Sequence, residues 1–362
     1  MLGSQSPHSI RIGDHTCGGA ALADQNLDGA VLAQREHVYY FTGHLHNPMH
    51  AAATLITADG AVTLAADTSD APAVDELAPY AAARYCTMHC QQLEEATAAL
   101  TPAIGPGKYG ADLAGVVVLT RTGGDLPVDL CPEILRLRKS KHPDEIDAIR
   151  DCIRLTEVMY DTAKRVIGPG VDEVAAFSEI LAAATSAGGE FLESCGNDFQ
   201  ANAMGGKPRR RPMNAGELYI LDAGPCLHGY HADNCRTYAI DGAPTEAQLE
   251  AWGRIDSVFP MLEGMIEPGL SAVELYDAAD AYFKEDGGPG MTHHLGHGIG
   301  LRPHEPPELN PRYSAILEVG DVITMEPGLY WDELEAGIRL EENYLVTADG
   351  VEKLTTYPRA LT

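Results

Sequence analysis

A short segment that recurs in the second part of the chain constrains the fold most strongly. Residues 167–174 read Ile-Gly-Pro-Gly-Val-Asp-Glu-Val, and residues 266–273 read Ile-Glu-Pro-Gly-Leu-Ser-Ala-Val. Each copy joins one helical segment to another, as Pro-Gly pairs do where a helix stops. A strand-rich stretch follows each pair of helices, over residues 217–240 and 322–347. The pattern predicts an α+β domain of two related halves.

The first helix of this domain has a recognisable start. The basic stretch over residues 135–141 leads to Pro143, and two acidic residues follow it. A proline in the first turn and acidic residues beside it are typical of a helix N-terminus. Apolar residues then recur with helical spacing. We expect this helix to end at Gly168 and a second one to span residues 172–186.

The sequence before residue 137 reads as short strands among Ala-rich helical segments. The short apolar runs read as strands cover residues 29–33, 37–43, 51–56, 61–65 and 115–119. Strands interleaved with helices favour a small α/β domain. We therefore predict two domains, residues 1–136 and 137–362. This division agrees with a chain of 362 residues and a typical size of about 150 residues per domain.

Composition excludes several classes of protein. Hydrophobic residues make up 45% and charged residues 22%, as in globular enzymes and unlike disordered or fibrous chains. The net charge of −28 repels phosphate backbones and anionic lipids, so we expect neither a nucleic-acid nor a membrane partner. The start of the sequence lacks the pattern of a secretory signal, and no two cysteines form a CxxC pair. We therefore expect a cytoplasmic protein with reduced thiols.

Acidic and imidazole side chains occupy comparable places in the two halves. Asp222 ends an apolar run read as a strand, and Asp233 follows after glycines that allow the chain to reverse. A hairpin of this kind can bring both carboxylates side by side. Glu326 ends a strand of the second half, and Glu341 lies in the next strand-like segment. His297 lies between these pairs, in a segment rich in His and Gly.

These residues indicate a metal site only when they are considered together. An aspartate at a strand end usually caps a turn, and a histidine in a Gly-rich loop usually makes a hydrogen bond. However, four carboxylates in one core would repel one another and could not all stay ionised without cations. Carboxylates can bridge two divalent ions, and an imidazole suits Mn, Co or Zn as a terminal ligand. We expect two divalent ions, Mn in the first place, with Co or Zn as alternatives.

The segments around these residues form an ordered set of motifs. They are residues 221–224, 229–237, 293–307, 324–330 and 337–341. In this order they resemble the Xaa-Pro aminopeptidase/prolidase group of the pita-bread metallopeptidases, the M24 family. Residues 20–45 and the Arg-Lys-Ser-Lys stretch resemble the creatinase-type N-terminal domain of that group. The resemblance covers the whole chain. It implies a pita-bread catalytic domain of two pseudo-symmetric halves, preceded by a smaller α/β creatinase-like domain.

The resemblance also implies roles for particular residues. The metal ligands are expected at Asp222, Asp233, His297, Glu326 and Glu341. Asp233 and Glu341 are expected to bridge the two ions. Asp222 is expected to bind one ion as a terminal ligand, with His297 and Glu326 on the other.

The expected reaction is hydrolysis of the amide bond next to proline in short peptides, by attack of a metal-bridging hydroxide. The enzyme would be an Xaa-Pro aminopeptidase or an Xaa-Pro dipeptidase, and by resemblance a homodimer. Glu326 is the candidate to carry the proton of the water to the leaving nitrogen. His304 is expected to donate to the tetrahedral intermediate, and His293 to hold the substrate backbone. Arg339 shares a strand face with Glu341 and matches the buried arginine of the family.

One segment departs from the family pattern. The histidine of a Pro-His-x-Arg-Pro-like segment falls on Gly205 here, and Lys207 and Arg209–Arg211 follow it. This basic cluster is either a solvated loop or a site for the C-terminal carboxylate of a substrate, which would limit the enzyme to short peptides. Arg302 and Pro303 also replace a commoner Asp-Val. These changes leave the metal ligands intact and bear on substrate specificity.

Two other functional classes stay open at this point. A non-peptide amide hydrolase, or a lyase acting on a small zwitterionic metabolite, can use the same scaffold, and Gly205 with the basic cluster favours that alternative. A non-catalytic binding module is disfavoured, because relatives of that kind lack the full ligand set. A metal-free creatinase-like enzyme is disfavoured for the same reason. A screen of Xaa-Pro dipeptides, Xaa-Pro-Yaa tripeptides and small N-acyl compounds with added metal separates these classes.

Overall fold

The chain forms two compact units. The computed structural model describes residues 15–67, 74–81, 88–121, 126–331, 334 and 337–362. The first unit ends at Arg138, and the second extends from Lys139 to Thr362. The predicted boundary between residues 136 and 137 lies within helix α5 (Cys131–Lys139) and stays a prediction.

The first unit contains a mixed sheet of six strands in the order β4-β3-β2-β1-β5-β6. Its strands are β1 (Gly29–Leu32), β2 (Ala52–Thr57), β3 (Val62–Ala66), β4 (Glu76–Pro79), β5 (Tyr109–Ala111) and β6 (Val128–Asp129). Its other helices are α1 (His15–Asp24), α2 (Arg35–Thr42), α3 (His89–Leu100) and α4 (Gly115–Arg121). Leu55 packs on α3 and α4, whereas Leu64 points to the opposite face, where it meets Val38 of α2. Helices thus cover both faces, as in the α/β domain that the sequence predicts.

Two of the runs predicted as strands are helices. Residues 37–43 lie mostly in α2 and residues 115–119 lie in α4. A short buried apolar run does not reveal by its periodicity whether it is a strand or a helix. For both runs the carboxylate of Asp112 favours a helix, because it accepts hydrogen bonds from N–H groups at the start of α2 and of α4. The distances are 2.9 Å to Gln34 N and 2.6 Å to Gly115 N.

Asp112 gives the first testable prediction. This fully buried carboxylate also accepts from Ala33 N at 3.1 Å and lies 3.0 Å from His37 Nδ1. Asp112→Ala leaves these donors buried without an acceptor and should lower the free energy of unfolding by about 2–4 kcal/mol. Asp112→Asn keeps one acceptor oxygen and should cost less. Urea unfolding and amide hydrogen exchange at Ala33 and Gln34 measure the effect. Unchanged exchange in Asp112→Ala would contradict this account.

The second unit begins with the helix that the sequence predicts. Helix α6 (Pro143–Val166) starts at Pro143, and α7 (Glu173–Gly188) follows the first Pro-Gly segment. The side chain of Asp172 accepts hydrogen bonds from Val174 N and Ala175 N and so caps α7. The second Pro-Gly segment likewise joins α8 (Glu246–Glu263) to α9 (Ala272–Lys284). Both helix pairs therefore lie where the repeat places them.

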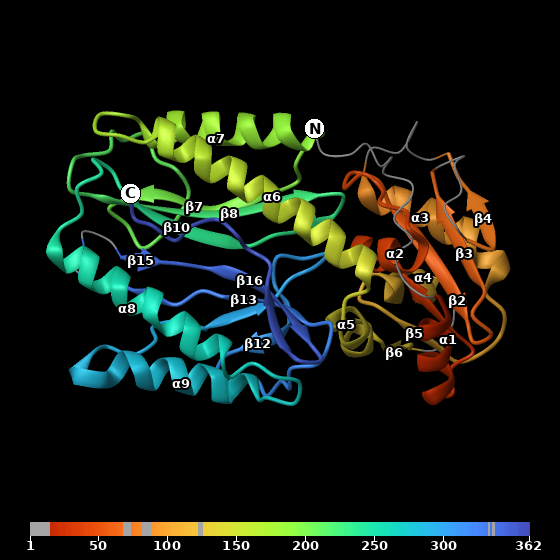
Figure 1. Ribbon diagram of the computed structural model, residues 1–362. Helices are drawn as coiled ribbons and strands as arrows, with labels where there is room; N and C mark the ends of the chain where they lie inside the picture. The colour runs from red at the N-terminus through yellow and green to blue at the C-terminus, as the bar shows by residue number, and fades with distance from the viewer. Residues whose placement is uncertain (1–14, 68–73, 82–87, 122–125, 332–333, 335–336) are drawn as a thin grey trace. The chain divides into compact units, whose positions relative to one another are not determined.

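An antiparallel sheet follows each helix pair. The first has the order β10-β8-β7, from β7 (Cys195–Ala201), β8 (Leu218–Leu227) and β10 (Asn234–Ala239), with β9 (Tyr230–His231) paired to β8. The second has the order β12-β11-β13-β16-β17, from β11 (Gly296–Gly298), β12 (Glu305–Leu309), β13 (Val322–Met325), β16 (Glu342–Thr347) and β17 (Gly350–Lys353). The short strands β14 (Gly328–Leu329) and β15 (Ile338–Arg339) form a separate ribbon. In Figure 1 the strands of this unit lie between α6 and α7 on one side and α8 and α9 on the other.

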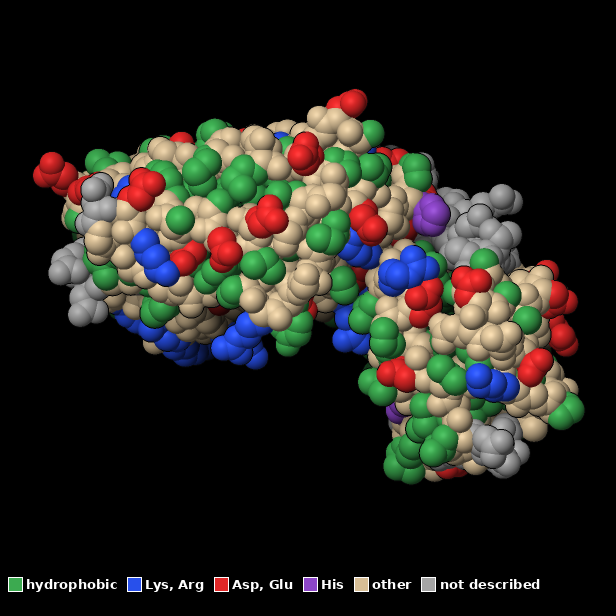
Figure 2. Space-filling view, turned by 90° about the horizontal axis from the view of Figure 1, so that it is seen from below, with side chains coloured by type: hydrophobic (Ala, Val, Ile, Leu, Met, Phe, Trp, Pro, Cys, Tyr) green, Lys and Arg blue, Asp and Glu red, His purple; other side chains and the backbone are tan. Residues whose placement is uncertain are grey.

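The surface matches the acidic composition. Figure 2 shows acidic side chains scattered over one face, among hydrophobic and uncharged ones. In the part of the chain that the structure describes, no helix combines the length and the apolar character that crossing a membrane requires.

Candidate metal centre

The first half of the second unit contributes two aspartates from neighbouring strands. Asp222 lies in the middle of β8, so its predicted place at a strand end is wrong, because β8 continues to Leu227. Asp233 directly precedes β10, whose Cys235 lies opposite Asp222 in the antiparallel register. The pair is therefore adjacent across the hairpin, as predicted, and both side chains are buried.

The second half contributes two glutamates and a histidine. Glu326 directly follows β13 and Glu341 directly precedes β16, and these two strands pair with Met325 opposite Glu342. His297 lies in β11, which pairs with β13. Four groups of side chains have possible ligand atoms that, within each group, all lie within 4.8 Å of one another. Two of these groups are Asp233 with His297 and His304, and His293 with His294 and Glu326. The other two share Glu341. One consists of Asp222, Asp233 and Glu341, and the other of His297, Glu326 and Glu341.

A cavity of about 360 Å³ opens at this cluster. Its lining contains all eight site residues that the sequence analysis singles out. They are Asp222, Asp233, His293, His297, His304, Glu326, Arg339 and Glu341. The structure thus brings together residues that are spread over most of the second unit.

Three of the carboxylates lie in surroundings that oppose their ionisation. Burial, followed by neighbouring carboxylates, raises the pKa of Asp233 and of Glu341 well above the usual range. Burial also raises the pKa of Asp222, although the charge of Arg339 opposes the shift. Within the described residues, Asp222 Oδ1 and both carboxylate oxygens of Glu341 are buried without a hydrogen-bond partner. Buried acceptor oxygens of this kind fit divalent cations, which need oxygen ligands and offset the repulsion.

Glu326 differs from the other three carboxylates. Burial alone would raise its pKa, but a hydrogen bond from His294 and the charges of His297, His294 and Arg339 outweigh burial and lower it to about 2. His294 Nε2 lies 2.7 Å from Glu326 Oε1. Burial lowers the pKa of His297 to about 4, which leaves its imidazole neutral and able to bind a metal. His294 was not predicted as a site residue, although it lies next to His293.

The remaining predicted residues line the cavity in different ways. The imidazole of His304 stacks on that of His297, with ring centroids 3.8 Å apart, and is otherwise exposed. Both ring nitrogens of His293 have partners, the backbone oxygen of His294 at 2.7 Å and the Tyr330 hydroxyl at 3.1 Å. Arg339 is buried and donates to the same hydroxyl at 3.3 Å. Tyr330 was not singled out as a site residue, although it lies within one of the motifs.

The basic cluster does not face this cavity. Arg209 Nη2 lies 2.8 Å from Glu173 Oε1, and Arg211 pairs with Glu217. Lys207 and Arg210 are exposed. Two of the three arginines are therefore neutralised within the chain. Both side chains are still partly exposed, so the solvated-loop interpretation stays a prediction, while Glu173 and Glu217 compete with any substrate carboxylate for these two arginines.

Comparison with known proteins identifies the family. Residues 147–348 match metallopeptidase family M24, and residues 19–112 match the creatinase/prolidase N-terminal domain. The chain belongs to metallopeptidase family M24. The resemblance drawn from the sequence motifs is thereby confirmed, and the protein is a prolidase-like metallopeptidase. Enzymes of this family use divalent metals, and the cluster offers plausible ligands.

Several relatives share both sequence and fold with this metallopeptidase. It is 31% identical to an Xaa-Pro dipeptidase of Pyrococcus furiosus over 231 residues, which are 63% of this chain and 65% of that one. An uncharacterized peptidase of Staphylococcus aureus is 28% identical over 350 residues, 93% of this chain and 97% of that one. The prolidase structure from Pyrococcus furiosus superposes with a TM-score of 0.80 at 22% identity, covering 94% of this chain and 100% of that one. The fold is thus the predicted pita-bread fold with a creatinase-like N-terminal domain.

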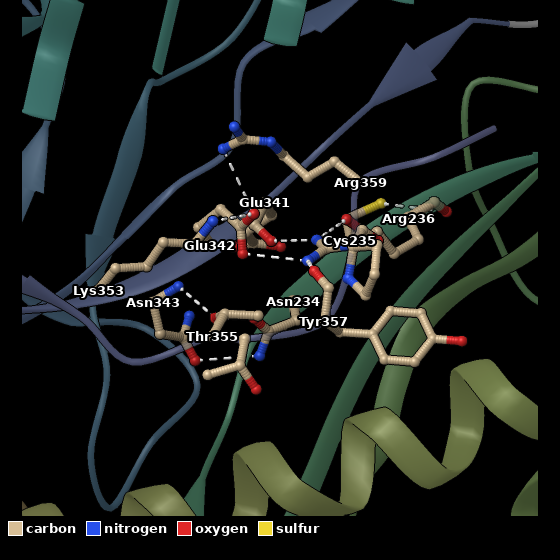
Figure 3. A network of polar contacts seen from close by, with 12 residues as sticks. Asn234, Cys235, Arg236, Glu341, Glu342, Asn343, Lys353, Thr355, Tyr357 and Arg359 are labelled. Carbon is tan, nitrogen blue, oxygen red and sulfur yellow. Dashed lines mark hydrogen bonds and ion pairs between the residues drawn. The ribbon is translucent and has the colours of Figure 1, made fainter. Parts of the chain in front are cut away.

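A network of polar side chains contacts the backbone of two candidate ligands of the metallopeptidase, Glu341 and Asp233. Figure 3 shows this network around Glu341. Arg236 Nη1 donates to the backbone oxygen of Glu341 at 2.8 Å, and Nη2 of the same residue contacts Glu342 Oε2 at 3.1 Å. Asn343 Nδ2 donates to the backbone oxygen of Asp233 at 2.5 Å. The network therefore restrains the backbone at Asp233 and Glu341, one residue from each half.

The oxygen atoms of Asp222 and Glu341 that lack a hydrogen-bond partner among the described residues predict that divalent ions stabilise the folded metallopeptidase. An ion bound at a concentration about a hundred times its Kd contributes about 2.7 kcal/mol. That amounts to a rise in Tm of about 5–10 °C for a unit of this size. Thermal unfolding with Mn²⁺, with EDTA and with Na⁺ at equal ionic strength measures the shift.

Glu341→Gln tests whether the ions bind at this cluster. It removes a carboxylate shared by two of the ligand groups and should abolish most of the rise in Tm. The exposed Glu267 supplies a matched control, since Glu267→Gln removes the same charge far from any predicted ligand. A full rise in Tm in the Glu341 variant would contradict the assignment.

Proposed function

We propose that this metallopeptidase is a dinuclear-metal hydrolase that cleaves the amide bond preceding proline in short peptides. The observation that carries the proposal is the group of four buried carboxylates and one neutral imidazole at the cavity, with oxygen atoms that lack partners in the described structure. The Xaa-Pro dipeptidase relative supports the choice of bond. The cavity of about 360 Å³ suits a substrate of a few residues.

The proposed centre would hold two divalent ions, with Mn²⁺ preferred and Co²⁺ or Zn²⁺ as alternatives. Glu341 is proposed as one bridge, because it lies in one group of ligand atoms with Asp222 and Asp233 and in another with His297 and Glu326. Asp233 is proposed as the second bridge, because it also lies close to His297, at 3.8 Å between Oδ2 and Nε2. Asp222 would then hold one ion, and His297 with Glu326 would hold the other. When bound, such ions supply an acidified water as nucleophile and polarise the scissile carbonyl.

The side chains of the cavity perform the remaining steps of the proposed reaction. Glu326, whose Oε1 lies 2.7 Å from His294 Nε2, is proposed to accept the proton of the attacking water and to return it to the leaving nitrogen. His304 presents its exposed imidazole to the cavity and donates to the developing oxyanion. His293 holds the substrate backbone by exchanging the Tyr330 hydroxyl for a substrate group. Arg339 keeps Asp222 oriented through a contact of 2.7 Å.

One observation favours the alternative function, a non-peptide amide hydrolase or a lyase acting on a small zwitterionic metabolite. The place of the family histidine is taken by Gly205, and the carboxylate of Asp198 lies against it. The cavity therefore differs from the family pattern where substrate specificity is expected to reside. The homodimer and the cytoplasmic location rest on the resemblance and on composition, and they stay predictions.

A substrate screen tests the proposal. The metal-free protein is reconstituted with Mn²⁺, Co²⁺ or Zn²⁺ and supplied with Xaa-Pro dipeptides, Xaa-Pro-Yaa tripeptides and small N-acyl compounds. We expect release of the N-terminal residue from prolyl peptides with at least one of these ions, and none with EDTA. Turnover of N-acyl compounds without turnover of any prolyl peptide would transfer the assignment to the alternative.

His304 separates catalysis from metal binding. His304→Ala should lower kcat by about 10²- to 10³-fold, the loss seen when one donor to an oxyanion is removed. Its metal content should stay that of the wild type, because His304 is not one of the five proposed ligands. Steady-state kinetics on the best substrate and metal analysis of the same sample measure the two effects. A change in kcat of less than about threefold would remove His304 from the mechanism.

A further inference from the structure

Asp198 is a carboxylate of the cavity that the proposed reaction does not use. It lies in β7, directly opposite Asp222 of β8. The register of the two strands shifts between Gly196 and Asp198, so a bulge at Asn197 turns Asp198 toward the cavity. Like charges directly opposite one another destabilise a pair of strands. This pair therefore requires a cation close by.

Arg339 is that cation, and it donates hydrogen bonds to both carboxylates. Its Nη2 atom donates to Asp222 Oδ2 at 2.7 Å and also to Asp198 Oδ2. The other oxygen of Asp198 accepts from Gly206 N at 2.5 Å. Neither oxygen of Asp198 is therefore free for a metal ion. Among the described residues that line the cavity, Arg339 is the sole lysine or arginine.

The backbone at Gly205 accommodates this arrangement. Gly205 has a φ of 138°, and a Cβ placed on it would lie 2.5 Å from Asp198 Oδ2. A side chain at position 205 is thus incompatible with the present position of Asp198. The chain carries a negative charge in the cavity where the family pattern carries an imidazole.

The chemistry of the substrate makes this charge important. In a free Xaa-Pro dipeptide the carboxylate is attached to the proline Cα, which is bonded directly to the nitrogen of the scissile amide. The carboxylate therefore stays within a few bonds of the scissile amide while that amide lies in the site. In a longer or amidated peptide the same position holds a neutral carbonyl. Because Arg339 is already shared by two carboxylates, a third finds no unshared lysine or arginine among the described residues that line the cavity.

We propose that Asp198 is a specificity residue that disfavours free Xaa-Pro dipeptides and favours peptides in which the proline carboxyl group is in an amide bond. This inference rests on the proposed function and narrows its substrate class to that of an aminopeptidase. It replaces the expectation that a basic cluster holds the C-terminal carboxylate. One extra unit charge at about 6 Å in a partly buried site changes affinity by about tenfold to a hundredfold.

A pair of substrates that differ in one charge tests the proposal. The value of kcat/KM is measured for Ala-Pro and for Ala-Pro-amide with wild-type enzyme and with Asp198→Asn. We expect the wild type to favour the amide by at least about tenfold, and the variant to reduce that preference by about fivefold or more. Asp198→Glu keeps the charge and should keep the preference. Glu267→Gln serves as the control for a charge removed elsewhere.

Product binding gives a readout that does not depend on turnover. Calorimetry of the metal-loaded protein should show that prolinamide binds more tightly than proline to the wild type, with a smaller difference in Asp198→Asn. If that variant does not fold, Asp198→Ser supports the same comparison. Equal preferences in wild type and variant would overturn the role of Asp198. Turnover of neither peptide would overturn the proposed function and with it the aminopeptidase specificity, and intact product discrimination would then show only that Asp198 disfavours a carboxylate in the cavity.

Discussion

Mutual repulsion among buried carboxylates is the constraint on which the second unit depends. Asp233 and Glu341 lie in the core with their pKa values raised well above the usual range, first by burial and then by neighbouring carboxylates. A fold tolerates such a group when cations compensate it, because an isolated buried carboxylate is costly. Arg339 compensates part of the charge at Asp222. The negative charge that Arg339 does not compensate points to divalent ions. The two Glu341 oxygens, which have no partner in the described structure, are candidate ligand atoms for such ions.

The two halves of the fold converge on this cluster, and their hydrogen bonds hold it rigid. Asp222 and Asp233 come from the first sheet, and Glu326 and Glu341 come from the second. Arg236 and Asn343 cross between the halves and bind the backbone oxygens of Glu341 and Asp233. A metal site held in this way is preorganised, which is what fixed coordination geometry requires. Each half therefore supplies candidate ligands whose backbone is held by a side chain of the other half.

The sequence allowed the family, the fold class and the convergence of eight site residues to be predicted, because those residues lie in an ordered set of motifs. Features that depend on partners far apart in the sequence could not be predicted from it. Asp198 faces the cavity because of a bulge in β7, and its partner Arg339 lies in the other half of the unit. Helices α2 and α4 looked like strands, because the Asp112 carboxylate that caps them belongs to neither apolar run. Arg209 looked available to a substrate, because Glu173 is far from it in sequence.

Anomalous diffraction from crystals soaked in Mn²⁺ tests the central claim most directly. Data collected at the manganese absorption edge locate each bound ion without reference to activity. The account predicts two peaks beside the cavity, with Asp233 and Glu341 between them, Asp222 at one ion and His297 with Glu326 at the other. No peak at this cluster, or ions bound without contact to Glu341, would contradict the account.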